Sequence, residues 1–116
     1  MRTCGQESEQ HMGFNASVTD AFEGDLREIL SYLIEEKGSV SAARNVMNAV
    51  DEAKELISAC PYINAISKKA RFSGRPYREH FIRGYAIVYK VVGNDILFLR
   101  LFHQAQLYER FVMEWE

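Results

Sequence analysis

The chain has 116 residues, of which 47% are hydrophobic and 26% are charged. This length is typical of one domain, and the composition is that of a globular protein. It excludes a disordered chain, a collagen-like chain and a chain that is mainly coiled coil. Residues 1–12 are polar, so we expect either a flexible N-terminal tail or a natural start at Met12, followed by a single domain over residues 13–116.

The formal net charge of −2 hides an uneven distribution of charge along the chain. Residues 1–67 contain 5 basic and 11 acidic side chains, which gives −6. Residues 68–110 contain 9 basic and 3 acidic side chains, which gives +6, and the last six residues add two glutamates. This asymmetry predicts that the second half of the chain faces an anionic partner.

A short strand over residues 14–18 and an amphipathic helix are predicted at the start of the domain. The helix begins at Asp20, which forms a capping-box pattern with Glu23, and it ends at Gly38. Apolar side chains recur along it at helical spacing. These side chains, which we expect to face the core, are Phe22, Leu26, Ile29, Leu30, Leu33 and Ile34.

A second amphipathic helix follows directly. Ser39 or Ser41 caps its first turn, and Cys60-Pro61 ends it, because a residue before proline is disfavoured in the α conformation. Only a few residues join the two helices, so we expect an antiparallel helical hairpin. The apolar stripe of this helix consists of Ala43, Val46, Met47, Val50, Ala53 and Ile57.

The second half of the chain has a β pattern. Strands are predicted over residues 77–82, 85–92 and 95–102, and Gly93-Asn94 is a two-residue hairpin turn between the last two. The last strand is apolar on both faces, which is typical of a central strand. A short helix over residues 105–115 is predicted to end the chain, with apolar residues at Leu107, Phe111 and Trp115.

The predicted order β-α-α-β-β-β-α gives an α+β fold, in which the helical hairpin packs on one face of a small, mostly antiparallel sheet. The other face of the sheet is then available for a ligand or a partner. No cysteine and histidine residues have metal-ligand spacing, so we expect neither a metal nor a cofactor. No apolar run is long enough to span a membrane and no signal peptide is visible, which predicts a cytoplasmic protein.

Several motifs, in this order, resemble those of the RelE/ParE superfamily of toxins from bacterial type II toxin–antitoxin and plasmid stabilisation systems. The resemblance covers about residues 14–111. Its first-helix residues are Ala21, Asp25-Leu26, Ile29 and Tyr32, and its second-helix residues are Gly38-Ser39, Ala42-Ala43, Leu56 and Pro61. A strand motif at residues 85–91 and a segment at residues 101–106 complete the set.

The resemblance implies a small toxin that inhibits growth and is neutralised by a cognate antitoxin, through which it also reaches operator DNA. RelE-like members enter the ribosome and cleave mRNA, with basic side chains that stabilise charge on phosphate. ParE-like members have the same fold but act on DNA gyrase. In this sequence Ala86 replaces the strand arginine of the nuclease pattern, and Gln104, Ala105 and Gln106 occupy the basic positions after the last strand. The missing strand arginine favours the ParE-like group, although the ParE pattern also has a basic residue near Gln106.

One basic stretch is the expected binding surface for the target, for nucleic acid or for an acidic antitoxin segment. Its residues are Lys68, Lys69, Arg71, Arg75, Arg78 and Arg83. The alternative is a solvated loop and edge strand, on which basic residues discourage aggregation. If the chain is a nuclease, the cleavage residues are expected among Arg78, Arg83, Arg100, His103 and Tyr108.

Four side chains in or next to the predicted strands each have a functional and a structural interpretation. His103 acts in acid–base chemistry, since its ordinary pKa lies near 6.5, or it hydrogen-bonds to backbone at the strand end. Arg100 binds an anion on the open face of the sheet, or it pairs with a carboxylate such as Glu79. Tyr85 and Tyr89 stack on bases or pack in the core, and the second interpretation is favoured.

Three functions therefore stay open at this point. The first is a toxin that binds DNA gyrase without cutting it. The second is a ribosome-dependent mRNA endonuclease. The third is an inactive member that acts only in its antitoxin complex. The missing strand arginine favours the first or the third over the second.

Overall fold

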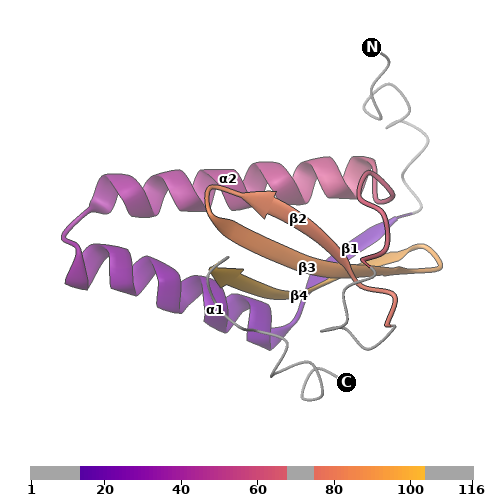
Figure 1. Cartoon of the computed structure of the whole chain (residues 1–116), viewed down its shortest axis with the longest axis horizontal. Helices are drawn as coiled ribbons and strands as arrows, with labels where there is room; N and C mark the ends of the chain where they lie inside the picture. The colour runs from indigo at the N-terminus through magenta and orange to yellow at the C-terminus, as the bar shows by residue number, and fades with distance from the viewer. Residues whose placement is uncertain (1–13, 68–74, 104–116) are drawn as a thin grey trace, which may run out of the picture.

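The structure is a computed structural model that describes residues 14–67 and 75–103 (Figure 1). Residues 1–12 and the helix predicted over residues 105–115 lie outside this part of the chain. The elements, in chain order, are β1 (Asn15–Val18), α1 (Asp20–Ser31), η2 (Tyr32–Glu36), α2 (Val40–Ala59), β2 (Arg78–Ile82), β3 (Tyr85–Val92) and β4 (Asp95–His103). The α+β prediction is confirmed, and η2 is one π-helical turn that continues α1.

The first helix is capped by Thr19, so the prediction of Asp20 as the cap is wrong. Thr19 has an extended backbone, and its hydroxyl oxygen accepts a hydrogen bond from the Phe22 amide at 3.0 Å. Asp20 is already helical and lies in the first turn, where a carboxylate interacts favourably with the helix dipole. The Thr19 hydroxyl also donates to the Leu99 carbonyl at 2.7 Å, so the cap ties α1 to β4.

The helical hairpin forms as predicted. Gly38, with a φ of +63°, ends the first helical segment in a conformation that favours glycine. Ser39 is the residue that caps α2, and its side chain accepts from the Ala42 amide at 3.0 Å. Figure 1 shows α1 and α2 running side by side in opposite directions. No helix within the described ranges is long and apolar enough to cross a bilayer.

The four strands form one sheet in the order β1-β4-β3-β2. β1 pairs with β4 in parallel, and the other two pairs are antiparallel. The prediction of a central last strand is confirmed, because β4 lies between β1 and β3. Gly93 has a φ of +59°, as a hairpin turn at this position requires.

A β-bulge in β4 sets which side chains face the helices. Tyr89 pairs with Phe98 and Val88 pairs with Arg100, so Leu99 has no partner on β3. Phe98 and Leu101 consequently both belong to the core under the helices, although they are three residues apart. The opposite face has its own apolar cluster, formed by Tyr77, Val88, Leu99 and Phe102.

Two residues of the predicted apolar stripes are not in the core. Ile34 is 44% exposed and Met47 is 47% exposed, so these two predictions are wrong. Ile34 lies in η2, where the wider π turn alters the helical spacing on which the prediction depended. Met47 follows Val46, which takes the buried position on α2.

Candidate functional site

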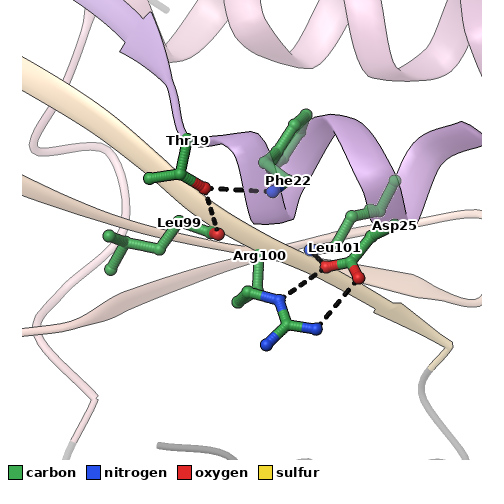
Figure 2. A network of polar contacts seen from close by, with 6 residues as sticks. All are labelled: Thr19, Phe22, Asp25, Leu99, Arg100 and Leu101. Atoms are coloured by element: carbon green, nitrogen blue, oxygen red, sulfur yellow. Dashed lines mark hydrogen bonds and ion pairs between the residues drawn. The ribbon is translucent and has the colours of Figure 1, made fainter. Parts of the chain in front are cut away.

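Arg100 is held by a carboxylate from α1 (Figure 2). Its Nε donates to Asp25 Oδ2 at 2.8 Å and its Nη2 donates to Asp25 Oδ1 at 2.9 Å, which is a bidentate ion pair. The same Oδ2 accepts the Leu101 backbone N–H at 3.0 Å. The guanidinium also lies over the Phe102 ring, 4.8 Å from its centroid. We call this arrangement the Asp25–Arg100 clamp.

The clamp closes a gap at the sheet edge. β1 ends at Val18, opposite Phe98, so the later part of β4 has no strand on that side. There the Asp25 carboxylate accepts the hydrogen bond from the Leu101 N–H, which the backbone of a neighbouring strand would otherwise accept. Of the two alternatives left open for Arg100, the structure shows the pairing with a carboxylate, but the partner is Asp25 and the suggested Glu79 is wrong. Glu79 instead faces Ser67, whose hydroxyl lies 3.4 Å from Glu79 Oε1.

One end of the sheet brings together two of the predicted site residues. Tyr85 pairs with Ile82 on one side and with His103 on the other, so the Arg83 turn and His103 lie at the same end. Two strand spacings separate Ile82 from His103, which is about 10 Å. The His103 ring packs edge-on against Tyr85, with 5.3 Å between the ring centroids. Burial, followed by the nearby Tyr32 phenol, raises the pKa of Tyr85.

The other predicted basic residues lie elsewhere or outside the described ranges. Arg78 is at the opposite end of β2, where its guanidinium donates to the Asn64 carbonyl and stacks on the Tyr62 ring at 5.0 Å. Arg75 precedes β2 and is partly buried. Three members of the basic stretch and one candidate cleavage residue lie outside the described residues, namely Lys68, Lys69, Arg71 and Tyr108. The single basic surface therefore stays a prediction.

A polar network fixes the loop after α2 to the sheet. Asn64 Nδ2 donates to His80 Nδ1 at 2.9 Å and to the Tyr89 hydroxyl at 3.2 Å. The Tyr89 hydroxyl donates in turn to the Pro61 carbonyl at 3.0 Å. Burial raises the pKa of Tyr89, which is fully enclosed. The preference for core packing over base stacking is confirmed for Tyr89, whereas no sequence pattern pointed to its partner Asn64.

The surroundings of His80 disfavour its protonated form. Because Asn64 donates to Nδ1, the proton of the neutral ring lies on Nε2. Burial lowers the pKa of His80 below 6.5, the value we take for the unfolded chain. Protonation would place a charge in a partly enclosed site and would turn the acceptor Nδ1 into a donor that faces the Asn64 amide.

We expect the folded state to lose stability as the pH falls below about 6.5. The unfolded chain then binds a proton at this histidine more readily than the folded chain does, so the loss continues until the lowered folded pKa is passed. The free energy of unfolding is measured by urea denaturation at several pH values from 7.5 to 5. It should fall less steeply with decreasing pH in His80→Gln than in the wild type. Equal pH slopes would show that another group controls this range.

A groove of about 320 Å³ lies between α2 and the edge strand β2. From the helix it is lined by Ala49, Glu52, Ala53 and Leu56. From the strand and the turn after it, it is lined by His80, Ile82 and Arg83. A second hollow, of about 460 Å³, follows the outer side of α1 and η2 and is lined mainly by polar side chains. Within the described ranges no group of three histidine, cysteine or acidic residues is arranged to hold a metal ion.

A helical hairpin on a four-stranded sheet of this order matches the fold that the RelE/ParE resemblance implies. Residues 16–108 match the family described as the ParE toxin of the type II toxin–antitoxin system parDE. The match covers most of the chain, and the chain therefore belongs to the ParE toxin family.

A solved structure has the same fold. A chain of the chromosomal ParDE TA system from P. aeruginosa superposes with a TM-score of 0.53 at 16% sequence identity. The superposition covers 80% of the present chain and 97% of that chain. No curated protein sequence matches the chain.

Proposed function

We propose that this ParE family toxin stops growth by binding DNA gyrase, without cutting nucleic acid, and that a cognate antitoxin neutralises it. Its place of action is then the bacterial cytoplasm, and operator DNA is reached only through the antitoxin. The observation that carries the proposal is the family match over residues 16–108. The ParE-like branch of the superfamily is the one whose members act on gyrase.

The geometry of two residues supports binding over cleavage. A nuclease of this fold needs cationic side chains aimed at the phosphate whose charge grows in the transition state. Ala86, at the position of the strand arginine, is fully buried and has no cationic group. Arg100 already donates two hydrogen bonds to Asp25, and drawing it toward a phosphate would break the clamp. Both observations favour a protein that holds its target.

The target is tested with two parallel assays on the purified toxin. We expect it to inhibit gyrase supercoiling of relaxed plasmid in a concentration-dependent way, whereas primer extension on mRNA from induced cells shows no new ends. The matched control is the same toxin mixed beforehand with its antitoxin, which should restore supercoiling. Codon-dependent mRNA ends with normal supercoiling would contradict the proposal in favour of the endonuclease. If cells grow without arrest and neither assay shows an effect, the chain is an inactive member that acts only in its antitoxin complex.

The antitoxin is tested separately from the target. Toxin genes of this class are expected beside a short gene for the antitoxin, so the two are coexpressed with a tag on the toxin alone. We expect the small protein to copurify in a fixed ratio and to relieve growth arrest. If the toxin inhibits gyrase but copurifies with no neighbouring gene product, gyrase binding is supported and neutralisation by a cognate antitoxin is contradicted.

A further inference from the structure

The face of the sheet that points away from the helices is shielded from water. It carries four apolar side chains, Tyr77, Val88, Leu99 and Phe102, which we call the outer cluster. Each of them is between 0% and 4% exposed. An antiparallel sheet with one uncovered face would leave the side chains on that face in contact with water. Another part of the molecule must therefore lie over the outer cluster.

The helices and the loop after α2 do not supply this cover. Within the described ranges, both helices pack on the cluster of the other face, and none of their residues belongs to the outer cluster. The loop after α2 runs along the edge of β2, where the Ser67 amide donates to the Tyr77 carbonyl at 2.7 Å. The Arg100 guanidinium stacks on one side of the Phe102 ring, which is too small an area to bury four side chains.

The segment that follows β4 begins at the right place. β4 ends at His103, and the residue before it, Phe102, belongs to the outer cluster. Residues 104–116 continue the chain from this point. As a helix they would be about 20 Å long, whereas a sheet of four strands is about 14 Å across. The segment is therefore long enough to cross the whole face.

The composition of this segment also suits an apolar surface. Leu107, Phe111 and Trp115 recur at the spacing of one helix face. The other candidate is the segment over residues 68–74, which contains three basic residues and one large apolar residue, Phe72. A stripe of three large apolar side chains matches the outer cluster better than a basic segment does, because burial of a charge without a partner is costly.

We propose that residues 104–116 fold back over the sheet and bury the outer cluster under Leu107, Phe111 and Trp115. The contact removes apolar surface from water on both sides. The family match ends at residue 108, so the family pattern does not specify the second half of this contact. The face that the sequence predicted to be available for a ligand or a partner is then occupied by the chain itself. This proposal does not depend on the target or on the antitoxin.

The first test uses the full wild-type chain. Trp115 is the only tryptophan, so its fluorescence reports on the segment without any substitution. In the native toxin we expect emission at a shorter wavelength than in concentrated urea, and an acrylamide quenching constant about threefold lower, because the indole is removed from water. Equal emission and quenching in both states would overturn the proposal. Protection that disappears on dilution, with an unchanged circular dichroism spectrum, would assign the cover to a second copy and overturn it as well.

A pair of substitutions tests where the segment packs. Val88→Ala and Phe111→Ala should each lower the thermal midpoint by several degrees. The loss in the double variant should be clearly smaller than the sum, because both side chains belong to one packed contact. Phe111→Ala combined with Val40→Ala is the matched control and should be additive, since Val40 is 56% exposed on α2. A protected Trp115 with additive losses for the first pair would place the segment elsewhere and contradict the proposal.

Discussion

Asp25→Ala should lower the free energy of unfolding by about 2–4 kcal/mol, as measured by urea denaturation. The side chains of Arg100 and Asp25 are only 18% and 15% exposed, so removal of the carboxylate leaves a largely buried guanidinium without its partner. The Leu101 N–H loses its acceptor at the same time. Because domains of this size are stable by about 5–15 kcal/mol, the loss is a large part of the total.

Two further variants distinguish the loss of the Asp25–Arg100 clamp from a general disruption of α1. Glu28→Ala removes an exposed carboxylate from the same helix and should change stability by less than about 0.5 kcal/mol. In Asp25→Ala combined with Arg100→Met, the buried charge is gone, so the double variant should be more stable than Asp25→Ala alone. A double variant as unstable as the sum of the single changes would show that the two side chains do not act together.

Phe98→Ala should cost about 3–5 kcal/mol and bring the protein close to unfolding. Phe98 is fully buried in β4, and its ring centroid lies 6.0 Å from those of Phe22 and Tyr89. Its carbonyl also accepts the Thr19 amide at 3.0 Å, where β1 passes into α1. Alanine would leave a cavity at the point where the first helix and the two central strands meet.

The measurement is the urea midpoint, together with the yield of toxin copurified with its antitoxin. Val92→Ala is the matched control, since Val92 is 58% exposed near the end of β3 and should change stability by less than about 0.5 kcal/mol. A similar loss in both variants would mean that the β3–β4 hairpin is sensitive to any truncation. A small effect of Phe98→Ala would contradict the core described above.

The helices and strands could be predicted because their signals are local. Helical spacing of apolar residues and the two-residue turn at Gly93-Asn94 depend on neighbours within about ten positions. The bulge at Leu99 could not be predicted in this way, since it is a property of how β4 aligns with β3. The cap at Thr19 was missed for a related reason, because its hydroxyl is oriented by a bond to Leu99, 80 positions away.

The polar contacts of the site were less predictable than the fold. Because Arg100 lies in an apolar strand, the sequence predicts that its guanidinium has a charged or hydrogen-bonding partner. Asp25 is 75 positions earlier and belongs to a helix face that looks like ordinary solvated surface. Its role depends on β1 being too short to cover β4, which is a matter of sheet geometry. Asn64 joins His80 and Tyr89 from a segment with no periodic pattern, so no local signal marked it.

The π-helical turn η2 has a consequence for how the chain tolerates changes in length. A π turn accommodates one more residue than an α turn, with hydrogen bonds from i to i+5. Deletion of one exposed residue, such as Glu35, would let α1 continue as an ordinary α-helix up to Gly38. The helical hairpin can therefore lose one residue at η2 and keep the same helix pair.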